Sequence, residues 1–234
     1  MLAIFKRELK SYFYSPIGYI FVGFFLLLSG YFFATGNLMS GIADMKMVFG
    51  NLSIVFLFLV PILTMRLISE EKKSKTDQLL LTSPVSLTGV VIGKYLAAVA
   101  VFLISLLITG VYPIILYIFS SPSLGEILAG YLGFFLMGSA FIAIGLFISS
   151  MTENQVISAV ASFGVLLLLW LIDMIVPFIQ NPFIARAIEW LSILRRFQDF
   201  TLGILSLSPI VYYVSFSVAF VFLTVRVLEK RRWS

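Results

Sequence analysis

Long apolar stretches separated by short polar segments run through the whole chain. The six stretches lie at residues 17–33, 52–67, 90–119, 127–149, 156–176 and 210–228. A helix that crosses the hydrocarbon core of a bilayer needs about 20 apolar residues, and each stretch approaches or exceeds that length. The pattern therefore predicts an all-α integral membrane protein with six transmembrane helices, formed by a single domain over residues 1–234.

A basic amphipathic helix is predicted ahead of the first span, at residues 1–15. On a helical wheel, Phe5 and Leu9 lie on one apolar face, and Lys6, Arg7 and Lys10 lie on the adjoining face. A basic amphipathic segment beside a span typically lies in the plane of the membrane interface. We expect this helix to be interfacial and to contact membrane lipid.

The longest polar interruption is the loop of residues 69–88, between the second and third spans. Its charged start contains Glu70, Glu71, Lys72, Lys73 and Lys75. Arg66 and Lys94 flank the loop at the ends of the two spans, where their long side chains can reach water. The loop is longer than a simple connection requires, which favours docking of a soluble partner over a role in topology alone.

The second half of this loop predicts a short amphipathic helix with its charges in water. Thr76 can cap that helix by accepting a backbone N–H bond, and Asp77 falls in the first turn, where the helix dipole favours an acid. The helix contains Gln78, and its apolar side consists of Leu79, Leu80 and Leu81. Pro84 ends it, because the residue before a proline is disfavoured in the helical region.

The connection between the fifth and sixth spans, residues 177–209, is long and mostly apolar. Asn181 can cap a helix that has Pro182 at its first position. Arg195, Arg196 and Asp199 follow that predicted helix. A segment that dips into the membrane must line protein or a wet cavity, so these three residues are candidates for an exit. A helix lying flat on the surface is the equal alternative.

Composition agrees with a membrane protein and excludes several kinds of chemistry. The chain is 61% hydrophobic and 12% charged, whereas soluble domains contain about 45–50% apolar and about 25% charged residues. It has no cysteine and no histidine, which excludes disulfides, thiolate metal sites and a histidine base. It also lacks a Walker A motif. We expect no enzyme activity and no cofactor in this chain, and its small net charge of +5 indicates no nucleic-acid partner.

Lysine and arginine are distributed asymmetrically across the predicted spans. If both termini are cytoplasmic, the inner side holds Lys6, Arg7, Lys10, Arg66, Lys72, Lys73, Lys75, Lys94, Arg226, Lys230, Arg231 and Arg232, and the outer side holds Lys46, Arg186, Arg195 and Arg196. Twelve basic residues on the inner side and four on the outer side satisfy the positive-inside rule. The loop of residues 69–88 is therefore predicted to be cytoplasmic.

Small residues are spaced along two of the spans. Gly89 and Gly93 begin the third span, and Gly130, Gly133, Gly138 and Gly145 run along the fourth. Such residues let helices approach closely. Packing within the chain is the first interpretation, and a dimer face is the alternative.

The loop after the second span resembles the membrane subunits of type-2 ABC exporters. The matching residues are Glu70, Glu71, Lys72, Thr76, Gln78, Leu79, Leu80, Thr82, Pro84, Val85, Gly93 and Lys94, whereas Lys75 stands where glycine is usual in that family. The tail, at residues 197–204, 211–215 and 226–233, is similar to the permeases of gliding motility and of nitrous-oxide-reductase maturation. Ser208 and Pro209 replace a charged pair that is often seen there.

The resemblance implies a half-transporter in the plasma membrane of a prokaryote. A second copy or a homologous permease would complete the pathway, and a separate cytoplasmic ABC ATPase would bind ATP and magnesium. The implied coupling residues are Glu70, Glu71, Lys72, Thr76, Asp77, Gln78, Leu79 and Leu80. An extracytoplasmic accessory subunit is a further partner to consider. A secondary carrier and a platform for envelope assembly remain the alternatives, and the substrate is not indicated.

Overall fold

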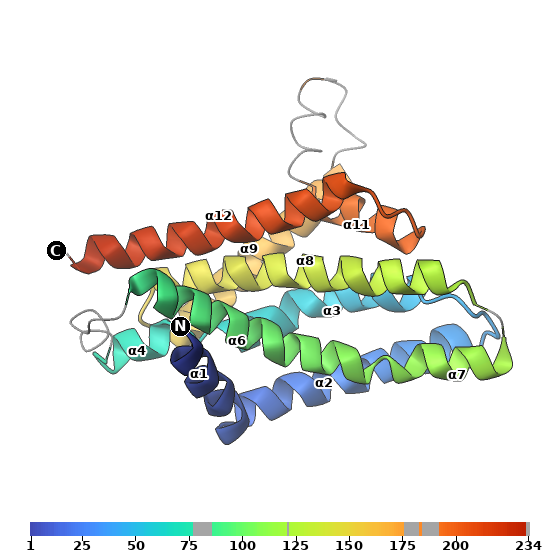
Figure 1. Cartoon of the computed structure of the whole chain (residues 1–234), viewed down its shortest axis with the longest axis horizontal. Coiled ribbons are helices and arrows are strands. Elements are labelled where there is room, and N and C mark those ends of the chain that lie inside the picture. Colours follow the sequence, from blue (N-terminus) through green and yellow to red (C-terminus); the bar gives the residue numbers. More distant parts are fainter. Residues whose placement is uncertain (77–85, 121, 176–182, 184–191, 233–234) are drawn as a thin grey trace.

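The structure is a computed structural model, and it describes residues 1–76, 86–120, 122–175, 183 and 192–232. Most of these residues are helical, and no strand occurs among them. The elements in chain order are α1 (Leu2–Tyr14), α2 (Pro16–Phe33), the π-helix η1 (Ala34–Leu38), α3 (Lys46–Thr64), α4 (Ser69–Lys73), α6 (Leu87–Ile108), α7 (Val111–Phe119), α8 (Leu124–Met151), α9 (Gln155–Ile175), α11 (Ile193–Thr201) and α12 (Leu207–Arg232) (Figure 1).

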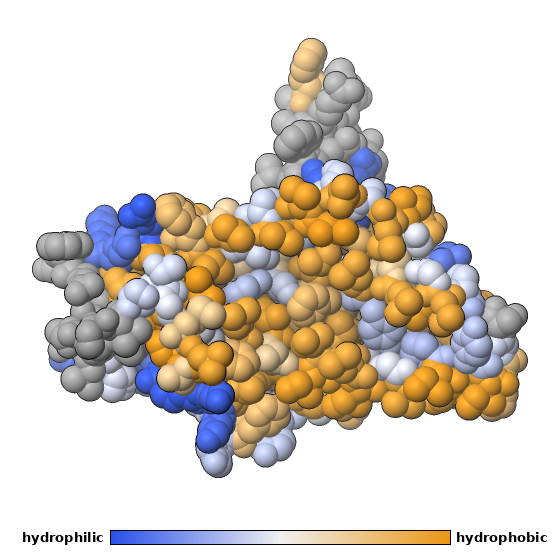
Figure 2. All heavy atoms as spheres, in the orientation of Figure 1, coloured by the Kyte–Doolittle hydropathy of each residue, from blue (hydrophilic) through white to orange (hydrophobic). Residues whose placement is uncertain are grey.

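The six predicted spans are confirmed as helices. Six helical stretches among the described residues are long and apolar enough to cross a membrane: Pro16–Leu38, Lys46–Lys73, Leu87–Phe119, Leu124–Met151, Gln155–Ile172 and Leu207–Arg231. Both termini and α4 lie at one end of the bundle (Figure 1). Hydrophobic residues cover most of the middle of the face in Figure 2, and strongly hydrophilic residues gather towards the end that carries the termini.

Helix α8 is the central helix of the bundle. It packs against α3, α6, α9, α11 and α12, and its glycines let these neighbours approach. A Cβ at Gly133 would lie 2.5 Å from the Phe200 side chain of α11, and one at Gly138 would collide with Phe102 and Phe56. The interpretation that the glycines of the fourth span serve packing within the chain is therefore confirmed at these positions.

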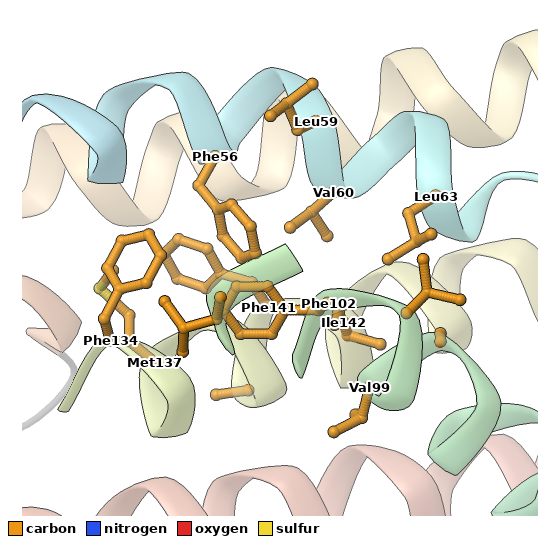
Figure 3. Packing of buried hydrophobic residues seen from close by; sticks show 14 of the residues in the cluster. Phe56, Leu59, Val60, Leu63, Val99, Phe102, Phe134, Met137, Phe141 and Ile142 are labelled. Carbon is orange, nitrogen blue, oxygen red and sulfur yellow. The ribbon is translucent and has the colours of Figure 1, made fainter. Parts of the chain in front are cut away.

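Phenylalanine rings from four spans form the centre of the core. The Phe56 ring of α3 lies 4.7 Å from that of Phe102 on α6, 5.4 Å from that of Phe134 on α8 and 6.2 Å from that of Phe25 on α2. Figure 3 shows Phe56, Val60 and Leu63 of α3 pointing towards the side chains of α6 and α8. Aromatic pairs at such distances add stability beyond the area they bury, so these rings stabilise the packing of α2, α3, α6 and α8.

The third span differs from its prediction because it is two consecutive helices. It breaks between α6 and α7 at Thr109 and Gly110. Pro113 has no N–H to donate to the Thr109 carbonyl four residues earlier. That carbonyl instead accepts hydrogen bonds from the Tyr112 N–H at 2.9 Å and from the Tyr131 hydroxyl at 2.7 Å. The break therefore follows from the proline, and the Tyr131 hydroxyl of α8 stabilises it.

Part of the connection between the fifth and sixth spans is α11, which begins after Ser192 and contains Arg195, Arg196 and Asp199. The Ser192 hydroxyl accepts a hydrogen bond from the Arg195 N–H at 3.3 Å and caps the helix. The helix predicted from Asn181 lies outside the described residues.

Enlarging Gly138 is expected to destabilise the bundle. A leucine at this position has no space between the Phe56 and Phe102 rings, and such overpacking costs about 1–3 kcal/mol. Gly125 is the matched control on the same helix, because a Cβ there meets nothing within 4 Å. We expect Gly138→Leu to lower the Tm of the detergent-solubilised protein and Gly125→Leu to leave it nearly unchanged. Equal Tm values for the two variants would contradict the packing of α8.

Candidate functional site

Six charged side chains from α1, α3–α4 and α6 meet at the end of the bundle that carries the termini. We call this group the charged junction; its members are Arg7, Glu8, Arg66, Glu70, Glu71 and Lys94. Helix α1 reaches the group because the chain turns sharply after it. Ser15 has an extended backbone and Pro16 occupies the first position of α2, a place where proline favours the start of a helix.

Four members of the charged junction form a closed set of ion pairs. Glu71 Oε1 lies 3.1 Å from an Arg7 amino group and 2.8 Å from Lys94 Nζ. Glu8 Oε1 lies 2.6 Å from the Arg7 amino group and 3.2 Å from Lys94 Nζ. Two acids therefore neutralise two bases. The hydrogen bond to Glu8 raises the pKa of the Arg7 guanidinium above its ordinary value, and the charges of Glu8 and Glu71 act in the same direction.

Lys94 does not reach water, contrary to the sequence prediction. Its side chain is only 2% exposed. Helix α1 packs closely over α6 at Gly93, where a Cβ would lie 3.1 Å from Ile4 Cγ2, and so it covers Lys94. A buried ammonium group requires charged or hydrogen-bonding partners, and Glu8 and Glu71 supply them. Glu71 therefore links the loop after the second span to both α1 and α6.

Arg66 fastens the other side of α1 to the end of α3. It donates hydrogen bonds to the Ser11 and Ser15 hydroxyls at 2.7 and 2.8 Å and pairs with Glu70 at 3.3 Å. The buried Tyr12 hydroxyl donates to the Leu63 carbonyl at 2.8 Å. Burial raises the pKa of Tyr12 well above its ordinary value, so Tyr12 acts as a neutral donor.

The charged junction lines an open polar cavity of about 320 Å³. The rest of its lining consists of Ser11, Tyr12, Leu67, Ser74 and Thr76. Its acids are paired with bases, and among the described residues no group of three or more His, Cys, Asp or Glu is placed to hold a metal ion. Three ion pairs of the junction join different elements: Arg7–Glu71, Lys94–Glu8 and Lys94–Glu71. The arrangement therefore suits the transmission of movement between helices.

Lys72, predicted to lie in water, is instead buried against the last turn of α8. It is 5% exposed, and its ammonium donates to the Ser150 carbonyl. The neighbouring Ser149 hydroxyl accepts hydrogen bonds from the backbone N–H groups of Ile68 and Ser69, both at 3.2 Å. Short helix α4 is therefore attached to α8, the centre of the bundle.

The turn after α4 contains Lys75, which stands where the family resemblance expects glycine. Lys75 has a φ of +57°, in the left-handed region that favours glycine. The Thr76 hydroxyl lies 2.9 Å from that of Ser74. The predicted helix with Asp77, Gln78, Leu79 and Leu80 lies outside the described residues.

Helix α1 is confirmed as an amphipathic helix. Phe5 and Leu9 are half-buried against the core, whereas Lys6, Arg7 and Lys10 are exposed. In Figure 1 it lies across the direction of α2 and α6. Residues Arg195, Arg196 and Asp199 of α11 lie apart from the charged junction, and the Arg196 guanidinium lies over the Tyr212 ring at 3.8 Å from its centroid.

Sequence reasoning missed two parts of the site, Glu8 and the pair Ser149–Ser150. Glu8 had a detectable signal, because it is the single acidic residue in positions 1–15, which also contain three basic residues. The serines had no such signal, because they contribute through a hydroxyl and a backbone carbonyl, which their residue type does not reveal.

A bundle of six helices long and apolar enough to cross a membrane, with a charged junction at one end, is the architecture of a multi-pass membrane protein. The chain belongs to the ABC-2 transporter family, since the family model described as "ABC-2 family transporter protein" matches residues 2–229. Comparison with curated proteins gives no match. The chain is therefore the permease component of an ABC transporter and not itself catalytic. Such permeases generally work with a separate ABC ATPase subunit and often dimerise.

Proposed function

We propose that this chain is the permease subunit of an ATP-driven exporter, coupled to a cytoplasmic ATPase through residues 69–88. The observation that carries the proposal is the position of Glu71. Its carboxylate lies at the start of the loop and forms ion pairs with Arg7 of α1 and Lys94 of α6. A force applied to the loop therefore reaches two helices at once.

The coupling contact consists of Glu70, Glu71, Lys72, Thr76, Asp77, Gln78, Leu79 and Leu80, with distinct roles. The half-exposed Glu70 carboxylate is available to arginines of the ATPase. Leu79 and Leu80 act as apolar anchors in a pocket of the ATPase, as buried hot-spot residues do in protein interfaces. Lys72 has a positioning role, because its contact with Ser150 connects the loop to α8.

The remaining features of the proposal concern orientation and assembly. The chain lies in the plasma membrane of a prokaryote with both termini cytoplasmic, which the twelve-to-four distribution of basic residues supports. A second copy or a homologous permease completes the pathway, and α11 with Arg195, Arg196 and Asp199 lies at its outer end. The tail supports a place near the gliding-motility and nitrous-oxide-reductase-maturation permeases.

Two other functions predict different behaviour. A secondary carrier needs no ATPase, and the absence of a clear internal repeat and the sparse intramembrane charge of the sequence argue against it. A membrane platform for envelope assembly can bind an ATPase without forming a pathway. Co-purification of an ATPase separates the carrier from the other two, and ATP-dependent transport separates the exporter from the platform.

The test is co-purification of the tagged chain from native membranes, followed by identification of the bound ATPase and measurement of ATP hydrolysis. We expect an ABC-type ATPase with the unchanged chain and its loss in the double variant Leu79→Ala/Leu80→Ala, since truncating hot-spot anchors costs about 2 kcal/mol or more. The matched control is Leu124→Ala/Leu128→Ala, two exposed leucines of α8 at the opposite end from α4. A folded chain that brings no ATPase would refute the proposal.

A further inference from the structure

A groove opens between α6, α8 and α12, on a different face of α6 from the one that carries Lys94. Its volume is about 730 Å³. The walls are apolar side chains of three spans, among them Leu96 and Val99 of α6, Leu136 of α8, and Val218 and Val221 of α12. Leu96 is 36% exposed and Val218 is 62% exposed, so the groove opens towards the hydrocarbon of the bilayer.

The polar groups deep in the groove are already occupied by hydrogen bonds within the chain. The Tyr95 hydroxyl donates to the Ser139 carbonyl at 3.2 Å, and the Ser139 hydroxyl donates to the Phe135 carbonyl at 2.8 Å. The Ser217 hydroxyl donates to the Tyr213 carbonyl, also at 2.8 Å. A polar ligand would lose its hydrogen bonds to water on entering the groove and would find few new partners there. A hydrocarbon chain makes no such hydrogen bonds, so its entry does not have this cost.

The groove has a basic mouth at the end of the bundle that carries the termini. Arg226 lines this mouth with Thr88 and Glu229. Glu229 accepts a hydrogen bond from one amino group of Arg226 at 2.8 Å, and a guanidinium has five N–H donors in all. Lys230 follows on α12, and Arg231 beside it pairs with Glu153 at 2.8 Å. Basic residues directly beside an apolar span attract anionic lipid headgroups.

The length of the groove suits an acyl chain. From Val225 to Tyr213 the groove follows α12 for about 18 Å at a rise of about 1.5 Å per residue. That length is close to the thickness of one leaflet, about 15 Å, and suits one acyl chain.

We propose that the groove is a binding site for an anionic glycerophospholipid of the leaflet on the side of the termini. One acyl chain lies between α6, α8 and α12, and the phosphate pairs with Arg226 at the mouth. The Thr88 hydroxyl is a second donor to the headgroup. Because α6 contributes Thr88 and Tyr95 to this groove and Lys94 to the charged junction, a bound lipid fixes α6 against α12. The proposal is independent of the ATPase coupling.

The test measures lipid retained by the full chain after reconstitution in equal mixtures of phosphatidylglycerol and phosphatidylethanolamine. Native mass spectrometry of the gently solubilised protein counts the bound lipids. We expect one phosphatidylglycerol per chain and its loss in Val218→Trp, where the indole fills the groove. Val211→Trp is the matched control, since Val211 is also 62% exposed on α12 and does not line the groove.

A second pair of variants tests the headgroup contact. Arg226→Gln should reduce the preference for phosphatidylglycerol about fivefold, as expected for one basic residue near an anionic surface. Lys46→Gln removes a positive charge at the opposite end of the bundle, where Lys46 pairs with Glu126, and should preserve the preference. Equal retention of the two lipids by the unchanged chain, or equal loss in both tryptophan variants, would overturn the proposal. Disulfide dimers of Val218→Cys in this cysteine-free chain would instead assign the groove to a second copy.

Discussion

Replacing Lys94 with methionine is expected to destabilise the folded chain by about 3–5 kcal/mol, the usual cost of removing one partner from a buried ion pair. The ammonium is 2% exposed and lies within 3.2 Å of both Glu8 and Glu71. Methionine has a similar length but no charge, so the two carboxylates would keep Arg7 alone as their cation. Their repulsion would loosen α1 and α4 from α6.

Thermal unfolding of the detergent-solubilised protein measures this effect. Lys6→Met is the matched control, because Lys6 is an exposed lysine of α1 outside the charged junction. The double variant Lys94→Met/Glu71→Gln should recover part of the loss, since it removes one charge of each sign, and the double-mutant cycle gives the coupling energy. If Lys94→Met unfolds at the same temperature as Lys6→Met, the ion pairs do not hold the junction together.

The spans were predictable because the bilayer imposes their length and composition. Their ends were less predictable, since amphipathic turns continue a helix beyond its apolar part. The sixth span was placed at residues 210–228, whereas α12 covers Leu207–Arg232, including basic turns that hydrophobicity does not detect. The break between α6 and α7 was detectable from Pro113, but its stabilisation by the Tyr131 hydroxyl depends on tertiary packing.

The charged junction was predicted only in part, for a physical reason. A sequence shows that Glu71 and Lys94 flank a loop, and the natural interpretation is that both charges lie in water. Their pairing depends on α1 folding back over Gly93, a contact between segments about ninety residues apart in the chain. Once α1 covers Lys94, the ammonium needs acids, and Glu8 becomes part of the site although no motif marks it.

The location of the charges also changes which variant tests the coupling loop. The two acids at its start, Glu70 and Glu71, are equivalent in sequence but not in structure. The Glu70 side chain is 50% exposed and pairs with Arg66 one helical turn away. An exposed ion pair of this kind stabilises the fold by about 1 kcal/mol or less. The Glu71 side chain is 18% exposed and joins two further helices. A change of both residues at once would mix a folding defect with a coupling defect.

Glu71→Lys is therefore expected to abolish folding, and Glu70→Lys to preserve it. A lysine at position 71 would stand beside Arg7 and Lys94 with Glu8 as the single acid, and an uncompensated buried charge costs several kcal/mol. Size-exclusion chromatography of the solubilised variants measures the folded fraction. Glu153→Lys is the control, because Glu153 is 62% exposed at the same end of the bundle.

With folding preserved, Glu70→Lys isolates the contact with the ATPase. A reversed charge at the exposed start of the loop should repel the arginines proposed to face it, and we expect ATP-dependent transport by the assembled complex to fall about tenfold or more, as for a charge pair worth about 1.5 kcal/mol or more. Glu153→Lys should leave transport unchanged. Full transport by Glu70→Lys would show that Glu70 is not part of the coupling contact. A folded Glu71→Lys variant would show that the charged junction tolerates a third cation. In that case α1 and α6 are held together by packing at Gly93 and not by charge.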